Sequence, residues 1–179
     1  MTESELIQGC KNKREDCQKL LFDRYSGKMM SVCTRYAKDR QQAQDILQEG
    51  FIKVFSYVKQ YRGEGSFEGW LRRVFVSVAA REISKNKIMF SEIDIGNLKD
   101  HSVDPEVVSK MSEDEIHMLI RTLPEGYRMV FNLNVIEGYT HEEIARMLGI
   151  QSSTSRVQLM KAKKHLQTLF KKKYNTVVV

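Results

Sequence analysis

Residues 140–150 of this chain read THEEIARMLGI, and residues 152–169 continue as SSTSRVQLMKAKKHLQTL. Thr140 followed by Glu143 forms a capping box, which predicts that a short helix begins directly after Thr140. Gly149 can adopt the positive φ that ends such a helix. A short helix, a glycine-containing turn and a longer basic helix are typical of a helix-turn-helix. The sequence therefore predicts a C-terminal DNA-binding unit whose second helix enters the major groove.

The first turns of that second helix supply the candidate contacts to DNA. Arginine can read guanine with two hydrogen bonds, and glutamine can read adenine. We expect Ser153, Ser155, Arg156 and Gln158 to point outward, and Lys161 to meet phosphates. The full candidate set is Ser152, Ser153, Thr154, Ser155, Arg156, Gln158 and Lys161. The alternative is an ordinary helical hairpin with a solvated basic face.

The rest of the chain also favours helices. Of its 179 residues 41% are hydrophobic, only two are proline, and no Gly/Pro clusters of a many-stranded fold occur. Apolar periodicity and capping residues predict a short helix after Thr2 and further helices over 14–36 and 41–58. Ser66 and Ser112 are expected to cap later helices, and Pro124 to start one that runs to about residue 137. The expected fold class is all-α.

Charge divides the chain into three segments. Residues 1–88 carry 17 Lys and Arg against 11 Asp and Glu, residues 89–113 carry 2 against 6, and residues 114–179 carry 10 against 6. The acidic stretch has no helical period, apart from a short helix that Asp104-Pro105 could start. We expect a helical domain over 1–88, an acidic linker over 89–112 and a helix-turn-helix domain over 113–179.

Sequence features of enzymes, metal sites and membrane proteins are missing. The cysteines, Cys10, Cys17 and Cys33, are odd in number and lack Cys-x-x-Cys spacing, so we expect reduced, buried thiols and no metal. His141-Glu142 begins a metalloprotease-like string, but Ala145 stands where the second histidine is needed, and capping explains Glu142 and Glu143 better. We expect no catalysis, no cofactor, no signal peptide and no membrane insertion, and therefore a cytoplasmic protein.

Two motifs in the N-terminal half could form binding surfaces. Asp45, Gln48, Glu49 and Ile52 are spaced i, i+3, i+4 and i+7, so they form one stripe along a helix. After it, residues 61–65 (YRGEG) predict a turn, and residues 67–74 (FEGWLRRV) begin a helix with a basic face.

These motifs resemble extracytoplasmic-function (ECF) sigma factors, a group of the sigma-70 family. Residues 123–131 and 137–150 resemble region 4 of that family, residues 45–55 resemble region 2.2, and residues 67–74 resemble the start of its next helix. The resemblance covers nearly the whole chain. This sequence departs from the usual pattern at Phe75, Ser77, Arg81, the run 153–155 and Gln158, which leaves the promoter sequence open.

The resemblance implies an initiation subunit of bacterial RNA polymerase. The stripe of Asp45, Gln48, Glu49 and Ile52 would dock on the polymerase clamp helices, unless it is merely a solvated face. The −10 element would be captured as a single strand by Tyr61, Arg62, Trp70, Arg72, Arg73, Ser77, Arg81 and Lys85. Trp70 could instead be a core residue, as Phe67 and Leu71 are expected to be.

The same resemblance implies partners and a path for the linker. The C-terminal domain would read the −35 element, and the acidic linker would thread toward the polymerase cleft or act as a solvated tether. An anti-sigma factor would cover the surfaces of both domains. Two other classes stay open: a dimeric operator-binding transcription factor that needs no polymerase, and a helical adaptor that binds acidic proteins rather than DNA.

Overall fold

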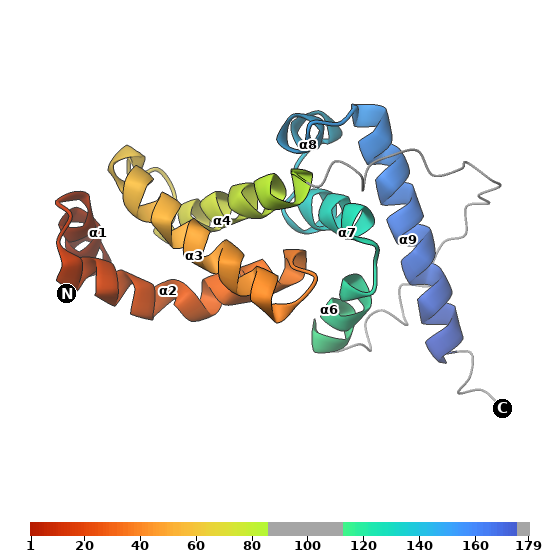
Figure 1. The fold of residues 1–179 in the computed structure, drawn as a ribbon, viewed down its shortest axis with the longest axis horizontal. Helices are drawn as coiled ribbons and strands as arrows, with labels where there is room; N and C mark the ends of the chain where they lie inside the picture. The colour runs from red at the N-terminus through yellow and green to blue at the C-terminus, as the bar shows by residue number, and fades with distance from the viewer. Residues whose placement is uncertain (86–112, 175–179) are drawn as a thin grey trace. The chain divides into compact units, whose positions relative to one another are not determined.

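The computed structural model describes residues 1–85 and 113–174, and regular structure within these ranges is helical (Figure 1). The chain divides into two compact units, Met1–Glu82 and Ile83–Val179, each of which is described by itself. The expected linker over 89–112, the cap at Ser112 and the short helix at Asp104-Pro105 lie outside the described residues.

The first unit consists of helices whose ends lie close to the predicted ones. They are α1 (Glu3–Lys11), α2 (Glu15–Tyr36), α3 (Arg40–Tyr57), the 3₁₀ turn η1 (Val58–Gln60) and α4 (Phe67–Ser84). Side chains cap the first turns of α1, α3 and α4. Thr2 and Glu5 form the predicted capping box of α1, and the Ser66 hydroxyl accepts a hydrogen bond from the Gly69 N–H at 3.1 Å.

Close packing of α3 on α4 depends on one glycine. A Cβ atom at Gly50 of α3 would lie 2.1 Å from Cε1 of Phe75 in α4. Phe75 is fully buried, and its ring meets that of Phe51 edge-on with centroids 5.2 Å apart. The core of this unit also contains Phe67 and Leu71, which confirms their prediction as core residues.

Within residues 113–174, the second unit contains four α-helices and one π-helical turn. They are α6 (Glu113–Arg121), α7 (Glu125–Phe131), the π-helical turn η3 (Asn132–Ile136), α8 (His141–Leu148) and α9 (Ser152–Tyr174). Ile120, Leu123 and Ala162 form a buried cluster, against which Tyr127 and Phe131 pack. The helix predicted to run from Pro124 to about residue 137 is an α-helix only as far as Phe131, because the π-helical turn η3 follows it.

A buried arginine joins α6 to α7. Nη1 of Arg128 donates to the carbonyl oxygens of Arg121 and Leu123, at 3.1 and 3.4 Å, and so satisfies acceptors at the end of α6. Burial lowers the pKa of this guanidinium from its ordinary value.

The three cysteines form no disulfide in the structure, and all three are buried, as predicted. Burial raises the pKa of the Cys33 thiol to about 12 and that of the Cys10 thiol to about 11, so neither is a reactive thiolate near neutral pH. Among the helices in the described ranges, none is long and apolar enough to cross a membrane.

Candidate nucleic-acid and polymerase interface

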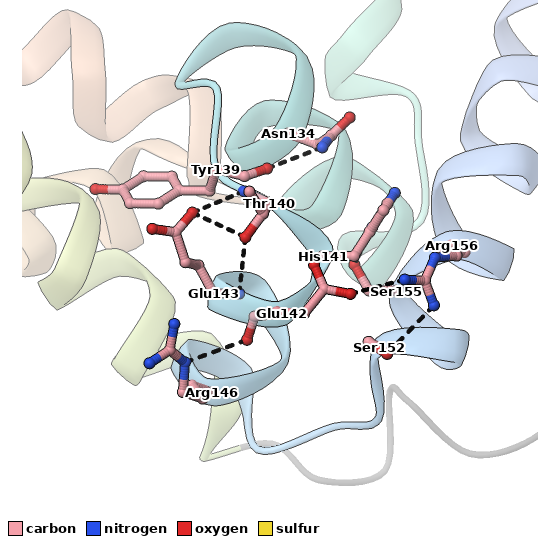
Figure 2. A network of polar contacts seen from close by, with 10 residues as sticks. All are labelled: Asn134, Tyr139, Thr140, His141, Glu142, Glu143, Arg146, Ser152, Ser155 and Arg156. Carbon is pink, nitrogen blue, oxygen red and sulfur yellow. Dashed lines mark hydrogen bonds and ion pairs between the residues drawn. The ribbon is translucent and has the colours of Figure 1, made fainter.

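The turn between α8 and α9 has the predicted helix-turn-helix geometry. The Thr140 hydroxyl accepts from the Glu143 N–H at 3.2 Å, and the Thr140 N–H donates to Glu143 Oε2 at 2.8 Å (Figure 2). The backbone hydrogen bond from Thr140 lowers the pKa of the Glu143 carboxyl. Gly149 ends α8 with φ 67°, and the Ile150 N–H then donates to the Ala145 carbonyl at 3.1 Å. The capping box and the glycine turn are confirmed.

Two of the four positions predicted to point outward from α9 are buried. Ser155 is fully buried, with its hydroxyl oxygen 2.8 Å from Nδ1 of His141, and Gln158 is 6% exposed. Ser155 and Gln158 lie on the same helix face as Leu159 and Ala162, which are also buried. That spacing of i, i+3, i+4 and i+7 is visible in the sequence and identifies the packed face. The prediction that Ser155 and Gln158 point outward was therefore wrong.

The other candidates on α9 reach the surface to different degrees. Ser153 and Arg156 are exposed, whereas Ser152, Thr154 and Lys161 are half-buried. Arg156 forms an ion pair with Glu142 of α8, with Nη2 2.7 Å from Oε1. Its Nη1 also donates to the Ser152 hydroxyl at 3.3 Å. The interpretation of both acids as capping residues holds for Glu143 only, because the Glu142 carboxylate pairs with Arg156.

The stripe on α3 faces solvent in the first unit. Asp45 and Gln48 are exposed, and Ile52 is 51% exposed although its side chain is apolar. Glu49 is half-buried, and its Oε1 lies 3.5 Å from the Lys53 ammonium. Carboxylates thus lie beside an exposed aliphatic side chain, an arrangement suited to a protein partner with an apolar centre and a basic rim.

The turn after η1 places Tyr61 differently from the prediction. Its ring is 9% exposed and packs edge-on against Phe67, with centroids 5.1 Å apart. Its hydroxyl donates to the Gly65 carbonyl at 2.8 Å, which braces the turn from inside. Tyr61 therefore offers no open stacking surface in this structure, and its direct contact with −10 DNA stays a prediction. Arg62 beside it is exposed.

Helix α4 carries a polar face beyond this turn. Trp70 is half-buried and stacks on Phe67, with centroids 5.6 Å apart and an interplanar angle of 18°. Trp70 therefore packs on the core and also keeps part of its surface accessible. Its contact with −10 DNA stays a prediction. Arg72 is half-buried, and four residues at i, i+4 spacing are exposed: Arg73, Ser77, Arg81 and Lys85.

These features define a helical protein with a helix-turn-helix unit, an acidic and apolar stripe, and a basic helix face. Two family descriptions match it: "Sigma-70 region 2" over residues 21–88 and "Sigma-70, region 4" over residues 113–166. An ECF RNA polymerase sigma-E factor of Haemophilus influenzae is 27% identical over 93% of this chain and 94% of its own length. An RNA polymerase sigma-H factor of Pseudomonas aeruginosa is 29% identical over 80% of this chain and 81% of its own length.

A solved structure has the same fold. The chain matches a complex of the sigma factor RpoE with the anti-sigma factor NepR from Bartonella quintana, with a TM-score of 0.50 and 15% identity. The match covers 86% of this chain and 96% of that one. The chain belongs to the ECF group of the sigma-70 family, whose members are initiation factors of bacterial RNA polymerase.

Proposed function

We propose that this chain binds core RNA polymerase and directs promoter-specific initiation, with residues 1–88 acting on the −10 element and residues 113–179 on the −35 element. One observation carries the proposal: two helical units that match sigma regions 2 and 4 follow each other in one chain. An operator-binding factor or an adaptor would need only one of these units.

The polymerase surface in this proposal is the stripe of Asp45, Gln48, Glu49 and Ile52. Burial of Ile52 against an apolar patch would supply the hydrophobic contribution, because half of its surface is open in the free chain. The carboxylates would meet basic residues at the rim of the contact, where they improve orientation and specificity.

The −10 surface in this proposal is the exposed face of α4 together with the preceding turn. Capture of a single strand needs stacking surfaces and phosphate contacts, and stacking contributes about 1–3 kcal/mol per base. Trp70 supplies the accessible ring, and the cations supply phosphate contacts. The set is Arg62, Trp70, Arg72, Arg73, Ser77, Arg81 and Lys85, with Tyr61 acting behind it as a brace.

The −35 surface in this proposal is the start of α9. Arg156 is the candidate for guanine recognition, since it is exposed and can donate two hydrogen bonds in a plane. Ser152, Ser153, Thr154 and Lys161 would contact the flanking backbone or base edges. The buried Ser155 and Gln158 are left out of this set.

The proposed sigma function also implies how the chain is regulated and where in the cell it acts. The similar RpoE structure contains an anti-sigma factor, and we propose that such a partner also controls this chain by covering both units. The acidic segment 89–112 would lie along a basic channel of the polymerase. The chain would act in the cytoplasm, without membrane insertion and without catalysis of its own.

Run-off transcription from a genomic promoter library tests this function. Core polymerase would be assayed with and without the chain, and with an Asp45→Ala/Glu49→Ala variant. We expect start sites that appear only with the wild-type chain, share paired upstream elements and weaken with the variant. Start sites unaffected by the chain, with a core shown to be active with another sigma factor, would reject the proposal.

A further inference from the structure

The base-reading candidate Arg156 is held by two side chains at the junction of α8 and α9 (Figure 2). Glu142 Oε1 accepts a hydrogen bond from Nη2 at 2.7 Å, and the Ser152 hydroxyl accepts one from Nη1 at 3.3 Å. Glu142 belongs to the preceding helix, so this contact fixes the guanidinium relative to both helices of the motif.

The contact leaves enough donors to read a base. A guanidinium has five N–H donors in a planar fork. Glu142 accepts from one donor on Nη2, and Ser152 accepts from one donor on Nη1. The other three remain for DNA, and guanine needs two, at O6 and N7. A free arginine loses side-chain entropy when it binds, whereas one that is already oriented loses less.

The negative charge of Glu142 also influences which group of the DNA Arg156 contacts. Both side chains are largely exposed, at 56% for Arg156 and 62% for Glu142, so DNA can reach the pair without unfolding the motif. The Glu142 carboxylate repels a phosphate group that approaches the same guanidinium. A base edge carries no such charge, so the pair favours base contact over phosphate contact.

We infer that Glu142 is a positioning residue for promoter recognition: it orients Arg156 toward one guanine of the −35 element and keeps it from nearby phosphates. This inference rests on the proposed function and assigns a specificity-determining role to a carboxylate that would not itself bind DNA.

The test uses holoenzyme assembled from core polymerase and the full chain. Its equilibrium affinity is measured for a duplex promoter found by run-off transcription and for versions with each −35 base pair replaced. Arg156→Ala should remove discrimination at one position, worth roughly 5-fold to 150-fold. Glu142→Ala should reduce discrimination at that same position by about twofold to fivefold, and should raise affinity for unrelated duplex. Glu142→Gln, which keeps an acceptor oxygen, should retain more discrimination than Glu142→Ala.

Two controls separate positioning from general effects. In the Arg156→Ala background, Glu142→Ala should cause no further loss of discrimination. Glu137→Gln removes a negative charge elsewhere in the unit and should leave discrimination unchanged. Unchanged discrimination in Glu142→Ala, or an equal loss when Arg156 is absent, would overturn the inference while leaving the sigma function intact. A wild-type chain that yields no promoter with active core would overturn both.

Discussion

Ser153 and Ser155 lie two residues apart on α9 but have different surroundings. Ser153 is exposed, whereas Ser155 is fully buried against His141 of α8. The sequence identified the helix correctly, yet the face of each serine depends on how α9 rotates against α8. The buried stripe that includes Leu159 and Ala162 determines that rotation.

Replacing these two serines should have different effects on the free energy of unfolding. Ser155→Ala removes the hydrogen bond between the buried Ser155 hydroxyl and His141 and should lower the free energy of unfolding by about 1 kcal/mol. Ser153→Ala should change it by less than about 0.5 kcal/mol, because the side chain is exposed. Urea unfolding of the full chain, followed by circular dichroism, measures both. Equal effects would contradict the described orientation of α9.

The capping carboxylate Glu143 should make α8 sensitive to acid. Its pKa is lowered in the folded chain by the hydrogen bond from Thr140, so its contribution to stability is complete above the unfolded pKa of about 4.3. That contribution is lost as the pH falls through the lower, folded pKa. Hydrogen-exchange protection of α8, corrected for intrinsic rates, should therefore fall below about pH 4. The fall should be smaller in Glu143→Gln, and an equal fall in both chains would contradict this assignment.

The starts of three helices were predictable from a side chain that caps the backbone. Thr2, Ser66 and Thr140 each precede a helix that begins at the next residue. Irregular elements were not predictable, because the π-helical turn over Asn132–Ile136 follows an unbroken helical pattern of apolar residues. The brace formed by Tyr61 was also missed, since a tyrosine in a glycine-rich turn can either stack on DNA or pack inward.

Alanine should have opposite effects at two glycines of the first unit, because only one of them contacts a neighbouring helix. Gly50→Ala would place a Cβ atom against the Phe75 ring and should destabilise the first unit by about 1–3 kcal/mol. Gly27→Ala, on the open face of α2 with nothing within 4 Å of the added atom, should stabilise it by up to about 1 kcal/mol. Trp70 is the single tryptophan, so its fluorescence during urea unfolding reports this unit. Stabilisation by both substitutions would show that the helices are not in close contact at Gly50.

At the scale of the whole chain, the two units carry different chemistry for one task. The first presents the acidic and apolar stripe of α3 and the basic face of α4, and the second presents the start of α9. The family could be identified from sequence because its motifs lie in the right order on both sides of an acidic segment. The contact residues were harder to predict, because burial of Tyr61, Ser155 and Gln158 depends on packing between helices.

Footprinting of one promoter tests the sigma function, because it reports duplex recognition and strand opening together. Holoenzyme containing the full chain should protect the −35 element from nuclease and make thymines of the −10 element reactive to permanganate. Neither signal should arise from core alone or from the chain alone. Protection of a duplex site by the chain without core, with no reactive thymines when core is added, would contradict the sigma function and favour an operator-binding protein.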